Sequence, residues 1–196
     1  MPRTFICVLA SLALACAARA ADVTVVLDFD GPHSDRSVEQ MKRETQDILK
    51  TAGLHLEWRA RADVGRRAYD NLVVVRFKGR CVLEPVPILY DERGPFAFTY
   101  NSDGAVLPFS EVECDQVTAS VQSAMGVDDF ARPDYLMGRA LGRVLAHELV
   151  HILTKSGAHA REGVAQPALS GHDLIGPPLK LTRNDVERLR EKAPPR

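Results

Sequence analysis

Apolar residues recur along the chain with two different spacings, which predict strands and helices. Runs that are continuous, or that alternate with polar residues, predict strands at 22–29, 54–58 and 72–77. Apolar residues three and four positions apart predict one helix at 35–51 and a second that begins at Pro133. This mixture predicts an α+β fold in which a twisted, mixed β-sheet packs on helices.

A hairpin and a further helix are predicted in the middle of the chain. The turn Asn101–Gly104, with Asp-Gly at its tip, separates strand-like segments at 96–100 and 105–109. Ser110 and Glu113 have the spacing of a capping box for the helix that follows. We expect the hairpin at the edge of the sheet, where it can hold an extended peptide by strand addition. A purely structural hairpin is the alternative.

The helix that begins at Pro133 has the clearest apolar stripe in the chain. Gly138 and Gly142 predict that another backbone packs closely against it, and Gly157 predicts its end in a left-handed conformation. Further along, Thr182 is suited to cap a last helix. The apolar stripe consists of Leu141, Leu145, Leu149 and Ile152.

Residues 1–20 have the features of a secretory signal peptide. Arg3 precedes an apolar run that is too short to span a membrane, and Ala18-Arg19-Ala20 has the small residues of a cleavage site. We therefore expect an exported protein, periplasmic or secreted. Residues 21–196 are expected to form one domain without a transmembrane segment. Cys16, which follows an imperfect lipobox, leaves a lipid-anchored form as the alternative.

Charge and cysteine content narrow the range of functions. The chain has 25 basic and 26 acidic residues without a long run of either sign, so we expect no nucleic-acid partner.

Of its four cysteines, Cys7 and Cys16 fall in the expected signal peptide, which leaves Cys81 and Cys114. In an oxidising compartment this pair predicts a disulfide. Two buried free thiols are the alternative.

Residues 147–151 read His-Glu-Leu-Val-His, which is the HExxH pattern. On a helix, this spacing places His147 and His151 one turn apart on the same face, with Glu148 beside them. Neutral imidazoles bind zinc and leave a coordination position for water, and an adjacent carboxylate can take a proton from that water. The pattern predicts a Zn²⁺ site with Glu148 as general base. A chance match on a solvated helix face is the alternative.

A catalytic zinc site of this type needs a third protein ligand. His159 follows the predicted end of the helix, at a point where the chain can turn back beneath the metal. We therefore predict His159 as the third ligand. His172 and Asp173 are the alternatives, and a polar loop position without a metal is the simplest other interpretation of His159.

The motif at 147–151, the turn at Gly157, His159 and the segment 163–167 together resemble the metzincin clan of zinc metallopeptidases. More closely, the chain resembles a group of short secreted bacterial proteins with an HELGH-type helix, a later His-Ser and a Gly-Ile-Met turn. Weaker similarity extends over most of residues 21–196. The resemblance implies a twisted sheet above a cleft and an active-site helix below it. It also implies a methionine-containing turn beneath the metal and a C-terminal helix.

The chain departs from the metzincin pattern at three places. Thr154 stands where these enzymes usually have glycine, and His159 comes eight residues after His151 where six is usual. Ala165 replaces the methionine of the turn, which removes a large thioether from below the metal. None of these changes deletes a proposed ligand or the base.

Two functions follow as expectations. The first is a secreted, zinc-dependent metallopeptidase that hydrolyses peptide bonds in a peptide or protein substrate, with Glu148 as the catalytic base. Its metal ligands are His147, His151 and His159. The alternative is a non-catalytic, zinc-stabilised module that binds peptides or proteins.

Overall fold

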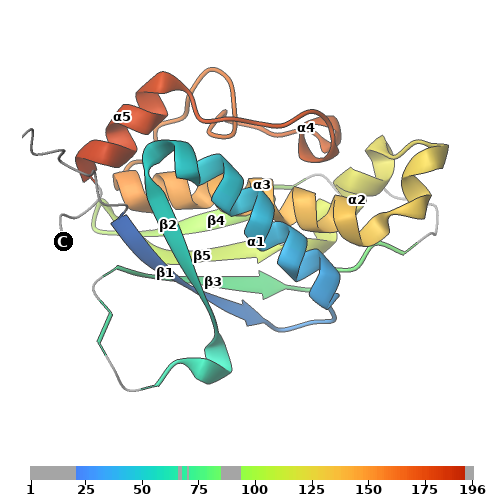
Figure 1. Cartoon of the computed structure of the whole chain (residues 1–196), viewed down its shortest axis with the longest axis horizontal. Helices are drawn as coiled ribbons and strands as arrows, with labels where there is room; N and C mark the ends of the chain where they lie inside the picture. The colour runs from blue at the N-terminus through green and yellow to red at the C-terminus, as the bar shows by residue number, and fades with distance from the viewer. Residues whose placement is uncertain (1–20, 66–67, 70, 85–93, 193–196) are drawn as a thin grey trace, which may run out of the picture.

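A computed structural model of the protein describes residues 21–65, 68–69, 71–84 and 94–192. The protein has an α+β fold with a five-stranded mixed sheet packed against helices, which confirms the predicted fold class (Figure 1). The expected signal peptide at 1–20 lies outside the described residues. The signal peptide, the cleavage site and the single domain at 21–196 therefore stay predictions.

The sheet has the strand order β2-β1-β3-β5-β4. Neighbouring strands are parallel except for the last pair, in which β4 runs antiparallel to β5. The strand predicted at 72–77 is therefore in the centre of the sheet, and the predicted hairpin forms one edge. The strands are β1 (Ala21–Phe29), β2 (Leu54–Ala60), β3 (Leu72–Lys78), β4 (Ala97–Ser102) and β5 (Ala105–Glu113).

The helices gather on one side of this sheet (Figure 1). Alternate strand residues such as Val25 and Val75 point to that side, where they are buried in one cluster with Leu49 of α1 and Leu145 of α3. The helices are α1 (Asp35–Leu49), α2 (Cys114–Ala124), α3 (Pro133–Thr154), α4 (Gly171–Ile175) and α5 (Arg183–Lys192), with short 3₁₀ turns at Lys50–Ala52, Arg61–Asp63 and Val127–Ala131.

Helix α3 packs against α1 at two glycines, as predicted. A Cβ atom at Gly138 would lie 2.4 Å from the carbonyl oxygen of Ser37, and one at Gly142 would lie 2.7 Å from the Cβ of Glu44. The small residues therefore allow the two helix backbones to approach. This contact fixes α3, which carries the HExxH motif, against the rest of the core.

The hairpin turns through Asp103 and Gly104, whose φ angles are 51° and 78°. Two successive positive φ values are those of a type I′ turn, which explains the Asp-Gly pair. The register shifts between Thr99 opposite Ser110 and Asn101 opposite Val106, so that β5 contains two more residues than β4 there. Pro108 lies in this irregular stretch of β5, as expected for a residue that lacks an N–H group.

Two predicted helix ends are wrong. Ser110 does not cap a helix with Glu113; it is a buried residue of β5, which continues to Glu113 before α2 begins at Cys114. Pairing of Ser110 with Thr99 in the sheet overrides the local capping signal. At the end of α3, Lys155 and not Gly157 has the left-handed conformation, with a φ angle of 48°.

The predicted disulfide is present. Cys81 and Cys114 are bridged, with their Cα atoms 4.9 Å apart, which joins the chain just after β3 to the first residue of α2. The cap predicted for the last helix is also present, since Thr182 and Asp185 exchange side-chain and backbone hydrogen bonds at the start of α5.

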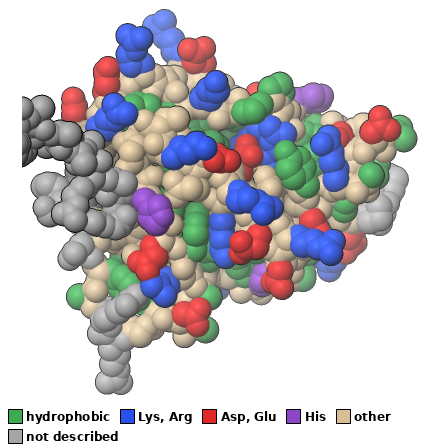
Figure 2. Space-filling model, in the orientation of Figure 1, with side chains coloured by type: hydrophobic (Ala, Val, Ile, Leu, Met, Phe, Trp, Pro, Cys, Tyr) green, Lys and Arg blue, Asp and Glu red, His purple; other side chains and the backbone are tan. Residues whose placement is uncertain are grey.

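Basic and acidic side chains are interspersed on the face of the molecule in Figure 2. Neither sign forms a separate patch on that face, in keeping with the nearly equal numbers of basic and acidic residues in the sequence. Within the described part of the chain, no helix has the length and apolar character needed to cross a membrane.

Candidate metal centre

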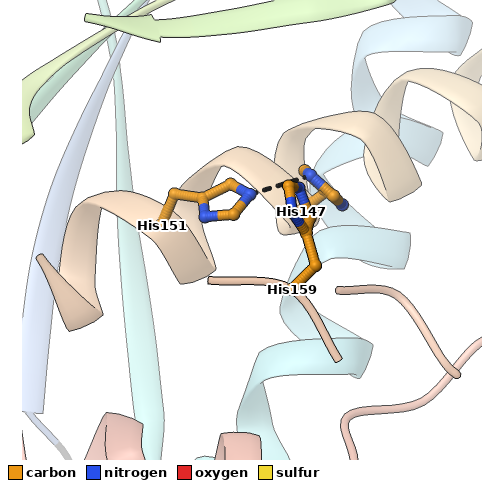
Figure 3. A group of neighbouring side chains, drawn as sticks. All are labelled: His147, His151 and His159. Carbon is orange, nitrogen blue, oxygen red and sulfur yellow. Dashed lines mark hydrogen bonds between the residues drawn. The ribbon is translucent and has the colours of Figure 1, made fainter. Parts of the chain in front are cut away.

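The side chains of three histidines lie close together on one face of α3. His147 and His151 project from successive turns of the helix, and His159 reaches them from the segment that follows it (Figure 3). One ligand nitrogen from each imidazole lies within 4.8 Å of the others. Among the described residues, this is the only group of three or more His, Cys, Asp or Glu side chains that could hold one metal ion. The side chains predicted as ligands are therefore in a position to hold a metal ion.

The two alternative third ligands are not in this cluster. His172 and Asp173 belong to the short helix α4. The carboxylate of Asp173 accepts hydrogen bonds from the backbone N–H and the hydroxyl of Ser170, at 2.8 and 2.6 Å. These bonds lower the pKa of Asp173, and they show that its side chain caps α4.

Backbone carbonyls fix the tautomer of both helix histidines. The Nδ1 atom of His147 lies 2.9 Å from the carbonyl oxygen of Val164, and Nδ1 of His151 lies 2.8 Å from that of Ser156. A carbonyl oxygen can only accept, so each Nδ1 carries the hydrogen. When the ring is neutral, Nε2 then has the lone pair with which imidazole binds a metal.

The two Nε2 atoms point at each other. The Nε2 atoms of His147 and His151 are 2.9 Å apart (Figure 3). Burial, with a smaller contribution from the neighbouring His151 and His159, lowers the pKa of His147 to about 4, so this imidazole is neutral at pH 7. The pKa of His159 is also lowered, first by burial and then by His151. The ligand nitrogens of the three imidazoles are close enough to share one cation, so the donor set fits a metal ion.

The turn at 163–167 supports two of the three histidines. It supplies the Val164 carbonyl that orients His147, and the N–H of Ala160, next to His159, donates to the carbonyl of Ala165 at 2.8 Å. The turn is itself held by a 3.0 Å hydrogen bond from the Val164 N–H to the carbonyl of Lys180. The fully buried Val164 side chain packs with Ile48 and Ala146. The turn therefore supports the site through its backbone, although Ala165 replaces the expected methionine.

Thr154 occupies the position of the expected glycine without disturbing the helix end. Its buried side chain donates to the carbonyl of Val150 at 2.7 Å and accepts a 3.1 Å hydrogen bond from Arg188 of α5. The threonine at this position therefore creates a contact between α3 and α5.

Glu148 is buried beside the histidines, with 6% of its surface exposed. Its Oε2 atom lies 2.5 Å from the hydroxyl of Thr99 and 3.3 Å from that of Ser110. Burial raises the pKa of this carboxyl, and the two hydroxyls together with His151 oppose that increase. A carboxyl with a raised pKa and a place in a cleft has the properties of a general base.

The cluster and Glu148 line one cleft of about 370 Å³. Ala97, Thr99 and Asn101 line it from alternate positions of the edge strand β4, and α3 lines the other side. The segment 167–169 adds an apolar wall. The cleft therefore places a metal-binding cluster, a carboxylate and a sheet edge around one space.

Four of these contacts were not predicted from the sequence: those of Thr99, Ser110, Ser156 and Val164. The backbone carbonyls of Ser156 and Val164 have no side-chain signal. Thr99 and Ser110 were seen only as parts of a hairpin and of a capping box. The alternation along 97–101 would have placed Thr99 on the same face as Ala97 and Asn101, but not opposite Glu148.

No model of a known protein family matches this chain, and a search of curated proteins finds no significant match. The site's own geometry therefore carries the functional inference. That geometry is a group of three imidazoles able to hold a metal ion, with a buried carboxylate beside it, at the wall of an open cleft.

Proposed function

We propose that this protein is an exported, zinc-dependent metallopeptidase. The observation that carries the proposal is that Glu148 and the three-histidine cluster line the same cleft. Both parts of a water-activating site, the metal-binding group and the base, thus face one space that a substrate can enter.

Zinc is the metal that this ligand set suits best. Three neutral imidazoles with a further coordination position free are a common catalytic zinc site. When bound, zinc supplies a Lewis acid that makes water more acidic and polarises a carbonyl oxygen. His147, His151 and His159 would hold it, and the carbonyls of Val164 and Ser156 keep the first two imidazoles in the correct tautomer.

Glu148 moves the proton in this proposal. As general base, its carboxylate takes a proton from the attacking water, and it then gives that proton to the amine that leaves. Burial favours the protonated carboxyl relative to a solvated one, which suits a group that must both accept and release a proton near neutral pH.

The substrate class follows from the shape of the cleft. Edge strand β4 borders it, so an extended peptide can lie along the strand and form backbone hydrogen bonds with its free edge. The apolar wall at 167–169 suits an apolar side chain of that peptide. A peptide or protein is therefore the proposed substrate, and no nucleic-acid partner is proposed.

The order of elements supports the proposed relationship to metzincins. A mixed sheet borders the cleft, α3 carries the motif on the other side, the turn at 163–167 lies next to the histidines, and α5 closes the described chain. The signal-like segment at 1–20 supports export, to the periplasm or beyond the cell.

The test is to replace Glu148 by glutamine and measure zinc content and cleavage of a peptide library. We expect E148Q to bind zinc as the unsubstituted protein does and to lose cleavage by about 10²-fold or more, because proton transfer is removed. E162Q, at an exposed position outside the cleft lining, is the matched control and should retain cleavage. Zinc binding without any cleavage by the unsubstituted protein would instead support the non-catalytic binding module.

A further inference from the structure

Thr99 and Ser110 form a cross-strand pair that faces Glu148. They lie directly opposite each other in the β4–β5 ladder, so their side chains point to the same face of the sheet. Both hydroxyls approach the same carboxylate oxygen, Oε2, at 2.5 and 3.3 Å. Two adjacent strands thus contact one atom of a side chain on α3.

The pair is itself held in place. Ser110 is fully buried, and its hydroxyl also lies 2.9 Å from the carbonyl oxygen of Phe98, next to Thr99 in β4. The hydroxyl of Ser110 therefore contacts both the edge strand and Glu148. A buried, hydrogen-bonded side chain of this kind has little freedom to rotate, so it can determine where the carboxylate lies.

We propose that Thr99 and Ser110 are positioning residues for Glu148, which hold its carboxylate through Oε2 so that Oε1 faces the cleft and takes up the proton of the attacking water. The inference rests on the proposed peptidase function. Under this proposal, the edge strand β4 has two roles, because it borders the substrate and also orients the base.

Two variants remove the hydroxyls without changing the size of the side chains greatly: Thr99→Val and Ser110→Ala. We expect each to lower kcat by about tenfold or more, because the carboxylate loses a hydroxyl contact and the base is less well oriented. KM should stay within about twofold, and zinc content should not change, since neither residue belongs to the histidine cluster. Thr99→Ser keeps the hydroxyl and should recover most of kcat.

Thr24→Val is the matched control. Thr24 donates to the carboxylate of Glu57 at 3.3 Å across the β1–β2 ladder, so it has the same chemistry as Thr99. It lies on the opposite face of the sheet from Val23 and Val25 and does not line the cleft. Its substitution should leave kcat and KM as they are.

The outcomes separate this inference from the proposed function. If the unsubstituted protein cleaves peptides and both Thr99→Val and Ser110→Ala retain full kcat, the positioning role is wrong and the peptidase proposal stands. An equal loss of kcat in Thr24→Val would also overturn the positioning role, because the effect would then come from the sheet as a whole. If the unsubstituted protein binds zinc and cleaves nothing, the proposed function fails, and this inference fails with it.

Discussion

His147 and His151 face each other through their Nε2 atoms at 2.9 Å, while their Nδ1 atoms contact the carbonyls of Val164 and Ser156. In each ring the hydrogen is therefore on the nitrogen that faces away from its partner ring. A cation between the two rings can be bound by both Nε2 atoms. The backbone around α3 thus organises the imidazoles for metal binding.

The first prediction concerns the third ligand. His159→Ala should weaken zinc binding by more than the roughly 10–100-fold that follows loss of a supporting hydrogen bond, because a direct ligand is removed. His159 is exposed, so its removal should not unfold the domain. Competition with a chelator of known affinity measures the change.

His172→Ala is the control for this experiment. His172 is also exposed but lies in α4, outside the histidine cluster. Its substitution should leave zinc affinity unchanged. Equal affinity in both variants would remove His159 from the ligand set.

The second prediction concerns pH and the metal-free protein. The pKa of His147 is about 4 in the folded state, below the ordinary histidine pKa of about 6.5 that applies to the unfolded chain. Between these two pH values the unfolded state binds more protons than the folded state. The free energy of unfolding therefore increases as the pH rises from about 4 to 6.5, and it decreases again as the pH falls through this range. This one group contributes up to about 3 kcal/mol to that change.

Urea unfolding at pH 7 and pH 4.5, with a chelator present, measures the effect. His147→Asn keeps a donor for the Val164 carbonyl but does not titrate, so it should reduce the loss of stability at low pH. His172→Asn serves as the control and should keep the full loss. Identical pH dependence in all three proteins would contradict the role given to His147.

The third prediction concerns the packing of α1 and α3. Gly142→Ala should destabilise the protein by about 1–3 kcal/mol, because the new Cβ would lie 2.7 Å from the Cβ of Glu44 and 2.9 Å from the carbonyl oxygen of Met41. This cost outweighs the gain of up to about 1 kcal/mol in helix propensity. Thermal unfolding of the zinc-loaded protein measures it.

Gly157→Ala makes the same chemical change at a place with room for it. No atom lies within 4 Å of a Cβ at Gly157, and its φ angle is not positive. The melting temperature should therefore change little. A loss as large as that of Gly142→Ala would mean that Gly157 has a structural task not visible in its contacts.

Elements with a local signal were predicted well from the sequence. The Asp103-Gly104 turn, the glycines of α3 and the HExxH spacing each depend on neighbours within a few residues or on one helix face. The disulfide was also predicted, because only Cys81 and Cys114 remain outside residues 1–20, the expected signal peptide. Such features require no knowledge of the tertiary structure.

Features that depend on distant partners were missed. Ser110 has a good capping signal, yet its hydroxyl contacts Glu148, 38 residues away, and its backbone pairs with β4. Gly157 was the obvious left-handed residue, but Lys155 takes that conformation because the N–H of Ser156 donates back to the carbonyl of His151 at 3.1 Å. At Ser110 a tertiary contact overrides the local preference, whereas at Lys155 the helix ends in a different local hydrogen-bond pattern from the one predicted.

The bridge between Cys81 and Cys114 spans 33 positions and closes a covalent ring that contains the whole β4–β5 hairpin. A single break in the backbone anywhere inside this ring leaves both new ends attached to the same molecule. If a peptidase cuts the chain once in this region, the strand that carries Thr99 therefore stays attached to the molecule. The disulfide does not prevent cleavage of the backbone between Cys81 and Cys114, but it keeps the strand that lines the cleft covalently attached.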